Sequence, residues 1–432
     1  MKACVIGLGK IGLPLAATYA SAGHQVFGVD INPKVIESIN SGGPLDLDEP
    51  QIPEMVKLAV DSGKLIATSN LEEAVSPADV VVVVVPLILD EKSGPNFSSL
   101  DQVSRSVGRY LKSGSLIIFE TTLPVGTTRD RLAPILENES GLKAGKDFYV
   151  AYSPERVYSG RIVENLKQYP KLVGGINPDS AKAAIKFYES VLKFNQRNDL
   201  TRENGVWDLG SSEAAELAKL AETTYRDVNI ALANQFARYA EQIGVDVYSI
   251  IEACNSQPFS HIHRPGVAVG GHCIPVYPEL YLSGDPAASI VAESRKVNLD
   301  MPGYALEMLE RKLGDLTGRK IAILGLSYRG GVKESAYSGA WSLVSQLKQR
   351  GAEPFVHDPL FSGTELRELK LEPFELGQEC DGAIVQTDHQ EYKQLSDADF
   401  PGAIAIFDGR RILKSENFKA ISLLVIGDGS FS

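Results

Sequence analysis

Short apolar runs alternate with segments of helical periodicity through the first part of the chain. The run at residues 80–85 is unbroken valine, as a parallel strand buried on both faces requires. Residues 11–22 repeat apolar positions at helical spacing, and Gly23 ends that helix. This alternation predicts a doubly wound parallel sheet in a domain at about residues 1–200. Its strands are predicted at residues 2–6, 25–29, 79–85, 115–120, 148–152 and 171–174.

Residues 212–245 follow a different pattern. They contain no proline, their first glycine is Gly244, and apolar positions recur at helical spacing. Ser211 or Ser212 is placed to cap this segment. A typical helix has about three turns, so one this long is expected to form the spine of a central helical domain at about residues 201–310 and to make a subunit contact.

Strand and helix patterns alternate again after Gly318. A helix is predicted at residues 338–349, ahead of Gly351. Strands are predicted at residues 320–324, 353–357, 382–386 and 403–407. The third domain, at about residues 311–432, is therefore expected to be α/β like the first.

Composition and charge narrow the possible partners. The chain has 432 residues, 44% of them hydrophobic, and a formal net charge of −12. That charge argues against nucleic acid or a membrane surface as a main partner, although a local basic pocket can still bind an anionic substrate. The apolar runs are too short to span a bilayer. The N-terminus has no signal pattern, and the four cysteines are scattered, so we expect a cytoplasmic protein without disulfides.

A glycine motif follows the first predicted strand and opens the first helix. It reads Gly7-Leu8-Gly9-Lys10-Ile11-Gly12, and Asp30 closes the next strand. Gly7 permits the tight turn, Gly9 lets a pyrophosphate approach the backbone, and Gly12 allows close helix–strand packing. Asp30 is placed to accept hydrogen bonds from the ribose hydroxyls, which favours NAD over NADP, while the nearby Lys34 weakens that exclusion. The expected fold is thus an N-terminal Rossmann-type domain, a helical domain with a spine helix and a C-terminal Rossmann-like α/β domain.

Residues 269–275, VGGHCIP, present one cysteine between paired glycines and a proline. This context disfavours a helix interior and favours an exposed turn. Beside a dinucleotide site, a presented Cys273 thiol indicates an oxidation that passes through a thiohemiacetal and a thioester. The alternative is a small buried cysteine next to a tight turn, since free cysteines are among the most buried residues.

The chain resembles the UDP-glucose/GDP-mannose dehydrogenase family over essentially its whole length. The resemblance rests on the glycine motif and on ETTLPVGTT (120–128), SPER (153–156), KLAETTYR (219–226), GGHCIP (270–275) and LGLSYR (324–329). It implies a four-electron oxidation at C6 of a nucleotide sugar, which consumes two NAD and gives a uronic acid. It also implies a central dimerisation domain, a C-terminal nucleotide-sugar domain and a homodimer.

The resemblance assigns roles to single residues. Cys273 matches the nucleophile. Lys219 matches a lysine that stabilises developing oxyanions. Without the motif, the simpler interpretation is a solvated lysine on the helix surface. Glu155 matches the carboxylate that orients or deprotonates the hydrolytic water, and Thr122 a hydroxyl that helps to hold that water beside the cofactor. The alternatives are a solvated loop carboxylate for Glu155 and a turn cap for Thr122.

Three positions depart from the family pattern. Thr223 stands where asparagine often binds the reacting oxygen, and its shorter reach puts that role in doubt. Tyr277 replaces a common aspartate, and a phenol supplies no anion at neutral pH. Lys333 replaces an arginine at the cofactor, so charge is kept and bidentate geometry is lost.

The motif around Cys273 also suggests the sugar. His272 resembles the form found in the branch that acts on UDP-N-acetylhexosamines, such as UDP-N-acetylmannosamine or UDP-N-acetylglucosamine. The other residues predicted to bind substrate are Arg156, Lys219, His263, Arg264, Gly271 and Arg329. The histidines near Cys273 do not have the spacing of a structural zinc site, and no metal is expected.

Other readings stay open. They are a UDP-glucose or other NDP-hexose 6-dehydrogenase, a two-electron dehydrogenase in which Cys273 is structural, and an inactive nucleotide-sugar-binding protein. The number of NADH formed per sugar distinguishes three hypotheses: two for the leading prediction, one for the two-electron enzyme and none for the inactive protein.

Overall fold

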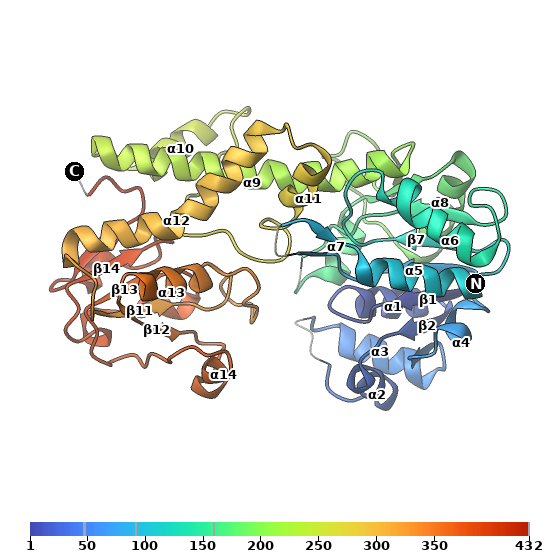
Figure 1. Cartoon of the computed structure of the whole chain (residues 1–432), viewed down its shortest axis with the longest axis horizontal. Coiled ribbons are helices and arrows are strands. Elements are labelled where there is room, and N and C mark those ends of the chain that lie inside the picture. Colours follow the sequence, from blue (N-terminus) through green and yellow to red (C-terminus); the bar gives the residue numbers. More distant parts are fainter. Residues whose placement is uncertain (46–48, 91–92, 159, 431–432) are drawn as a thin grey trace. The chain divides into compact units, whose positions relative to one another are not determined.

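The computed structural model describes residues 1–45, 49–90, 93–158 and 160–430 (Figure 1). The chain divides into two compact units, Met1–Glu222 and Thr223–Ser432. The long helix α9 (Ser212–Ile243) contributes to both units.

The first unit is built on an eight-stranded sheet, in the order β10-β9-β8-β7-β4-β1-β2-β3. Its strands are β1 (Lys2–Ile6), β2 (Gln25–Val29), β3 (Leu65–Thr68), β4 (Val80–Val83), β7 (Leu116–Phe119), β8 (Tyr149–Tyr152), β9 (Lys171–Gly175) and β10 (Val206–Asp208). From β3 to β8 all pairs are parallel and follow the order 3-2-1-4-5-6 of a Rossmann sheet. The predicted Rossmann-type domain is confirmed.

One strand runs against the prediction of an entirely parallel sheet. β9 pairs antiparallel with β8, with Tyr152 opposite Gly174. Apolar patterning reports burial but not strand direction, which is set by the connection. Among the described residues of this connection the one helix is the short α7 (Ile162–Gln168), and β9 starts at the edge where β8 ends. Lys171, the first residue of β9, is therefore placed at the carboxyl edge of the parallel strands.

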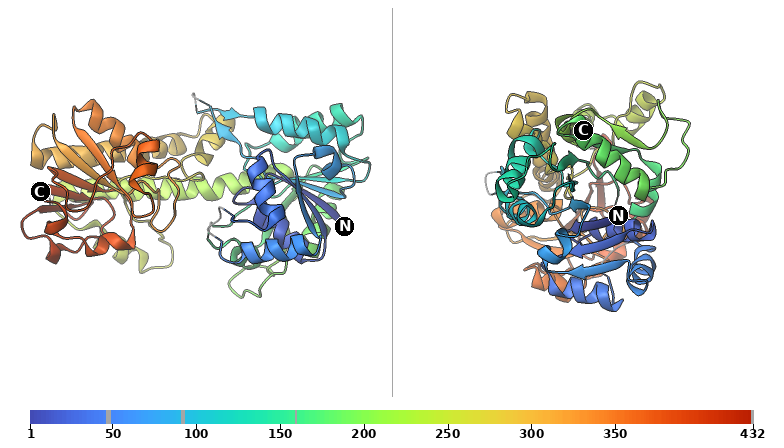
Figure 2. Two further views of the ribbon diagram at one scale, coloured as in Figure 1. Left: turned by 90° about the horizontal axis from the view of Figure 1, so that it is seen from below. Right: turned by 90° about the vertical axis from the view of Figure 1, so that its right-hand side faces the viewer.

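Helices cover both faces of the first sheet (Figure 2). One face packs on α1 (Gly12–Ser21), α3 (Ile52–Asp61), α7 and α8 (Pro178–Val191). The remaining helices are α2 (Pro33–Ser41), α4 (Leu71–Val75), α5 (Ser98–Tyr110) and α6 (Ala133–Ser140), with a π-helix at Thr127–Leu132 and a small hairpin of β5 (Ile88–Leu89) and β6 (Pro95–Asn96). Each valine of β4 is buried, as the unbroken apolar run predicted.

The second unit holds a five-stranded sheet in the order β12-β11-β13-β14-β15, and all its pairs are parallel. Its strands are β11 (Lys320–Leu324), β12 (Glu353–His357), β13 (Gly382–Val385), β14 (Ala405–Asp408) and β15 (Ser422–Val425). This is the 2-1-3-4-5 order of a doubly wound sheet. The predicted C-terminal α/β domain is confirmed.

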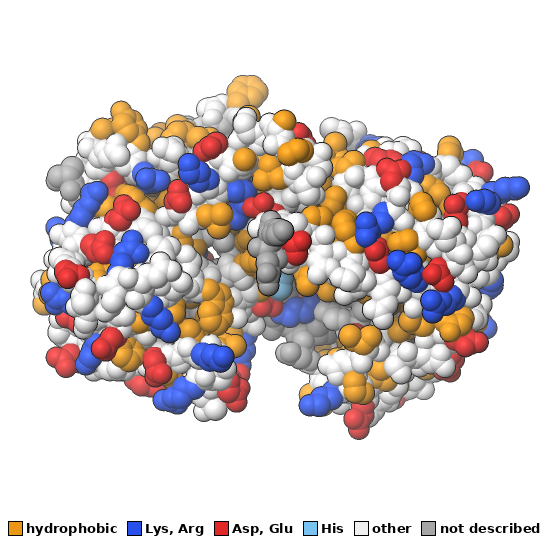
Figure 3. Space-filling view, viewed as in Figure 1, with side chains coloured by type: hydrophobic (Ala, Val, Ile, Leu, Met, Phe, Trp, Pro, Cys, Tyr) orange, Lys and Arg blue, Asp and Glu red, His pale blue; other side chains and the backbone are white. Residues whose placement is uncertain are grey.

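The helices of the second unit gather on one face of its sheet. The buried cluster on that face includes residues of α9, α10 (Val247–Asn255), α12 (Ser289–Leu313) and α13 (Gly339–Gln349). The opposite face is covered by aromatic side chains such as Phe374, Tyr392 and Phe400, partly from 3-10 turns. α11 (Tyr277–Gly284) and α14 (Gly363–Glu368) complete the unit. Acidic and basic side chains are interspersed on the face of the molecule drawn in Figure 3.

Candidate functional site

The glycine turn after β1 has the shape of a pyrophosphate cradle. Gly7 has a φ of +94° and its amide donates to the Val29 carbonyl at 2.8 Å. A Cβ atom at Gly12 would lie 1.7 Å from the Gly7 oxygen, so only glycine fits. A Cβ atom at Gly9 would meet nothing within 4 Å, which leaves that backbone open to a ligand. No side chain caps α1, so its N-terminal amides face the turn.

Asp30 is held in position by two backbone amides. Its carboxylate accepts from Leu8 and from Asn32, each at 2.9 Å. Four lone-pair directions on a carboxylate leave acceptors for a ribose diol. The glycine turn and Asp30 thus fit a dinucleotide such as NAD. Lys34 is exposed on α2, where its amide donates to the cap Asn32.

Glu155 follows β8 and belongs to a buried group of charges. Its side chain is 10% exposed, and its Oε2 accepts from Lys171 Nζ at 2.8 Å. The same ammonium donates to Glu120 Oε2 at 2.8 Å, and Glu120 is fully buried at the end of β7. Lys219 on α9 donates to the Glu155 carbonyl at 2.6 Å and is 8% exposed, so it is not a solvated helix lysine. The structure therefore brings Glu155 and Lys219 together, as the predicted site needs.

The surroundings shift the pKa values of the two carboxylates in opposite directions. Burial alone raises the pKa of Glu155, but the charge and hydrogen bond of Lys171 outweigh it and hold that pKa below its usual range. For Glu120 burial dominates and the neighbouring Glu155 adds to it, so its pKa is raised despite Lys171. Of the two carboxylates, Glu155 is thus the one whose pKa is held below the usual range.

Two other predicted residues lie in the same region of the first unit. Thr122 is 6% exposed in the loop that follows β7. Arg156 donates from Nε to Glu222 on α9 at 2.9 Å. Arg156 therefore lies next to Glu155 in the first unit, and a partly exposed ion pair with Glu222 holds its guanidinium.

The turn of the ETTLPVGTT segment is tied to α9 by a buried carboxylate that sequence reasoning did not single out. Glu216 accepts from the amides of Gly126 at 2.6 Å and Thr128 at 2.8 Å, and from the Thr128 hydroxyl at 2.6 Å. Burial raises its pKa to about 7, although those hydrogen bonds favour the ionised form. Glu216 thereby holds this loop to the helix that carries Lys219.

In the second unit, Cys273 lies exposed in a turn ahead of α11. Gly271 has a φ of +89°, and a Cβ atom there would lie 2.9 Å from the Tyr328 ring, which explains the glycine. His272 is 63% exposed, with Nε2 at 3.5 Å from Glu334. Tyr277 begins α11 and its amide donates to the Cys273 carbonyl at 2.9 Å. The thiol is presented by the turn, so the alternative of a buried structural cysteine is wrong.

The loop with His263 and Arg264 is fixed to α9. Asn229 accepts from the His263 amide at 2.9 Å and donates to the His261 carbonyl at 2.7 Å. Burial lowers the pKa of His263, with a smaller contribution from Arg226. Arg264 is exposed. Thr223 is 3% exposed and also lies on α9.

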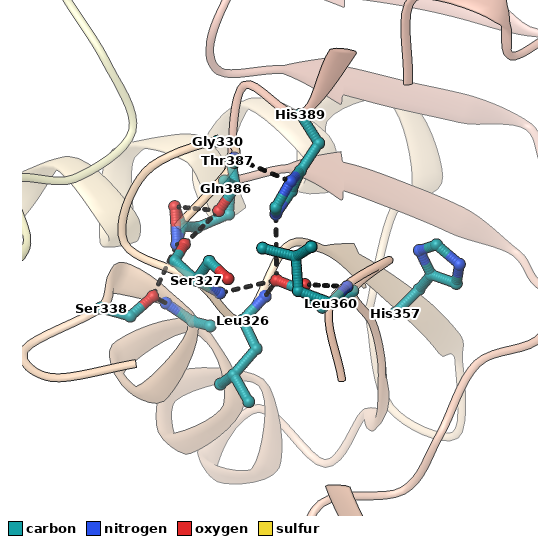
Figure 4. Close-up of polar contacts among 12 residues, drawn as sticks. Leu326, Ser327, Gly330, Ser338, His357, Leu360, Gln386, Thr387 and His389 are labelled. Carbon is teal, nitrogen blue, oxygen red and sulfur yellow. Dashed lines mark hydrogen bonds and ion pairs between the residues drawn. The ribbon is translucent and has the colours of Figure 1, made fainter. Parts of the chain in front are cut away.

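At the carboxyl edge of the second sheet, Asp358 is engaged by donors of its own domain. Asp358, placed after β12 as Asp30 is after β2, accepts from the amides of Leu326 at 2.8 Å and Ser327 at 2.7 Å, and from Leu360 at 2.9 Å. Buried His389 adds a contact at 3.1 Å, drawn in Figure 4. With these acceptors used, Asp358 cannot serve a ribose as Asp30 can, so the dinucleotide site is in the first unit.

The remaining basic residues lie around this edge. Arg329 follows β11, with its guanidinium carbon 5.9 Å from the Tyr328 ring centroid. Lys333 pairs with Glu365 on α14 at 2.5 Å. Arg410, which sequence reasoning missed, donates from Nη2 to the Ala268 carbonyl at 3.0 Å and thus holds the loop that leads to Cys273.

Among the described residues, no group of three or more His, Cys, Asp or Glu side chains is arranged to hold a metal. Within the same part of the chain, no helix has both the length and the apolar content needed to cross a membrane.

Known proteins share sequence and fold with this chain. Three domain models of the UDP-glucose/GDP-mannose dehydrogenase family match: the NAD binding domain at residues 1–192, the central domain at 213–298 and the UDP binding domain at 322–415. UDP-N-acetyl-D-mannosamine dehydrogenase of Pyrococcus horikoshii is 38% identical over 423 residues, 96% of each chain.

Two solved structures are also similar. The UDP-N-acetyl-mannosamine dehydrogenase of Staphylococcus aureus is 30% identical with a TM-score of 0.83, and covers 99% of this chain and 98% of its own. A UDP-glucose dehydrogenase of Pyrobaculum islandicum is 27% identical with a TM-score of 0.85, and covers 98% of this chain and 96% of its own.

Proposed function

Because this chain belongs to the UDP-glucose/GDP-mannose dehydrogenase family and is an NAD-dependent nucleotide-sugar dehydrogenase, we propose that it oxidises C6 of a UDP-N-acetylhexosamine to the uronic acid. UDP-N-acetyl-D-mannosamine is the proposed substrate. The observation that carries this proposal is the full-length similarity to a UDP-N-acetyl-D-mannosamine dehydrogenase, together with His272 beside an exposed Cys273.

We assign the covalent chemistry to Cys273. NAD, when bound at the glycine turn, supplies the hydride acceptor for both oxidations. After the first oxidation, the Cys273 thiolate forms a carbon–sulfur bond to the aldehyde carbon. Loss of the second hydride turns this thiohemiacetal into a thioester. Water then breaks the carbon–sulfur bond, which releases the acid and returns the thiol.

The first unit supplies the groups for proton and oxyanion handling. The ammonium of Lys219 stabilises the negative oxygen that forms at C6 in each addition step. Glu155, which stays ionised, takes the proton of the attacking water. Thr122 is assigned to holding that water beside the cofactor, and Thr223 to a single hydrogen bond to the reacting oxygen. Cys273 has no aspartate at position 277 to assist it, so thiol activation falls to other groups.

The substrate and cofactor contacts remain proposals from the motif positions. We assign the sugar nucleotide to Arg156, Lys219, His263, Arg264, Gly271, His272 and Arg329, and the cofactor to the glycine turn, Asp30, Lys34, Thr122 and Lys333. Arg329 and Lys333 lie within the segment that matches the UDP binding domain model. The free cysteines fit a reducing compartment, and we place the protein in the cytoplasm.

A panel of nucleotide sugars tests the substrate and the electron count together. We expect two NADH per UDP-N-acetyl-D-mannosamine, a uronic acid by mass, and a kcat/KM at least ~10-fold above that for UDP-glucose, since a site built for one substituent discriminates by about that factor or more. Efficient turnover of UDP-glucose alone would reject the N-acetyl assignment. One NADH per sugar would indicate a two-electron enzyme, and none an inactive binding protein.

We further propose a homodimer formed through α9. Leu232, Phe236, Tyr239 and Ile243 repeat at helical spacing and are 45%, 37%, 60% and 52% exposed. Phe236 and Tyr239 also line a surface concavity of about 550 Å³. A contiguous exposed apolar stripe is a typical feature of a protein–protein interface.

Charged residues on that stripe should separate the subunits. Phe236→Glu with Tyr239→Glu is expected to give a monomer by light scattering at micromolar concentration, because burying carboxylates without partners is costly. Leu58→Glu is the control, since Leu58 is 62% exposed on α3 in the first unit. A wild-type monomer, or a double variant that remains dimeric, would contradict the assignment.

A further inference from the structure

Lys171 is a buried cation placed between two carboxylates. Its side chain is 4% exposed, and Nζ donates at 2.8 Å both to Glu120 and to Glu155. It opens β9, whose other residues are the apolar or small Leu-Val-Gly-Gly. Its position follows from the antiparallel direction of β9, which starts at the edge where β7 and β8 end. A parallel β9 would have carried this lysine to the opposite edge of the sheet.

The two carboxylates beside Lys171 have different hydrogen-bond donors. On the Glu120 side, Oε1 accepts from the hydroxyls of Tyr188 on α8 at 2.6 Å and Tyr19 on α1 at 3.3 Å. The Lys171 ammonium also lies 4.9 Å from the centroid of the Tyr188 ring. Glu120 is therefore fully buried, with the Lys171 ammonium on one oxygen and two phenol hydroxyls on the other.

On the Glu155 side, the second carboxylate oxygen accepts from the Arg156 amide at 2.7 Å. The charged groups that face it from neighbouring elements are Lys171 on β9 and Lys219 on α9, and Glu120 after β7 interacts with it through charge. Arg156 is paired with Glu222 instead. Each Glu155 oxygen thus has one fixed donor and retains a lone pair for a further one.

We propose that Lys171 is a positioning residue for thioester hydrolysis: it fixes the direction of the Glu155 carboxylate and keeps it ionised, with Glu120 as the counter-charge behind it. This rests on the proposed function, in which Glu155 takes the proton of water. Lys171 itself touches neither sugar nor cofactor in this scheme; it acts through Glu155.

A purely structural role explains this arrangement less well. Burying an ion pair gives little net stability, and well-packed apolar residues of similar volume often do as well or better. An apolar side chain in place of Lys171 would, however, remove the ammonium that is hydrogen-bonded to the buried Glu155 carboxylate, and its loss favours the protonated form. The charge is therefore needed by whatever requires Glu155 as a carboxylate.

The test follows the pH dependence of hydrolysis in Lys171→Met, Lys171→Arg and Glu120→Gln, with Lys167→Met as the control on an exposed lysine of α7. Rates of uronic acid release are measured from about pH 5 to pH 9 with saturating NAD and UDP-N-acetyl-D-mannosamine, alongside the acyl group on Cys273 by intact-protein mass spectrometry.

In Lys171→Met the acid limb, the low-pH side of the profile of rate against pH, should move at least ~1 pH unit upward, because Glu155 then binds a proton more readily. Acylated Cys273 should accumulate, and KM should change little. Lys171→Arg keeps the charge and should bring the limb back toward the wild-type position. Glu120→Gln removes the competing carboxylate and should move the limb downward. Lys167→Met should match the wild type.

A folded Lys171→Met enzyme with the wild-type acid limb overturns the inference. If that variant does not fold, Glu120→Gln decides: an acid limb that stays in place or moves to higher pH in this variant overturns the inference. Failure of the proposed function looks different: the wild-type protein then forms no uronic acid, or forms it without an acyl group on Cys273 in any variant.

Discussion

Replacing Cys273 by alanine is expected to abolish uronic acid formation, with a loss of at least ~10³-fold in kcat, because no other group supplies the covalent intermediate. The first oxidation needs no thiol, so trace aldehyde and less than one NADH per sugar can remain. Cys273 is exposed at the start of α11, so the substitution removes no core packing and stability should change little.

Two companion variants make this result specific. Cys273→Ser should form an ester slowly, since an alcohol is a weaker nucleophile and its ester a poorer acyl donor than a thioester. Cys254→Ala on α10 is the control, because Cys254 is partly exposed in the same unit and has no assigned role. If Cys273→Ala still makes the acid at the wild-type rate, the oxidation passes through a hydrated aldehyde.

The elements that burial pattern alone specifies were predictable. The strands at 2–6, 25–29, 320–324 and 353–357 are found where the pattern placed them, because each is an apolar run bounded by turn residues. The glycine motif was equally predictable, since only glycine tolerates the 1.7 Å approach at Gly12. The direction of β9 was not, because it depends on how the connection after Glu155 returns to the sheet.

The same distinction holds for the candidate site. Cys273 and Lys219 stand out in the sequence because a motif surrounds each of them. Lys171 carries no such motif, and its partners Glu120 and Glu155 are 51 and 16 positions away. The antiparallel direction of β9 brings these three residues together. The signal in the sequence was a charged residue, Lys171, at the start of an otherwise apolar strand.

Hydrogen-bond partners also distinguish two aspartates, one after the second strand of each sheet. Asp30 and Asp358 occupy equivalent places in their sheets, and both accept backbone amides. Only Asp358 meets a buried histidine, His389, and that contact depends on a loop after β13. Sequence patterns predict the strand ends well, but which carboxylate stays available for a ligand is decided by long-range contacts.

Glu155→Gln is expected to stop turnover after oxidation and before release of the acid. Glutamine keeps the shape of the side chain but cannot accept a proton from water, so hydrolysis should slow by about 10²- to 10³-fold, as for loss of a general base. Both hydride transfers remain possible. Mixing enzyme, NAD and UDP-N-acetyl-D-mannosamine should therefore give a burst of two NADH per active site, followed by a slow steady rate.

The covalent product of that burst identifies the blocked step. Intact-protein mass spectrometry should show the mass of the acylated sugar nucleotide on Glu155→Gln, and none when Cys273→Ala is added to it. Glu164→Gln, an exposed carboxylate on α7, is the control and should neither burst nor accumulate an adduct beyond the wild type. A Glu155→Gln enzyme that loses the burst itself would place Glu155 in the oxidation steps, whereas an unchanged steady rate would remove it from the reaction.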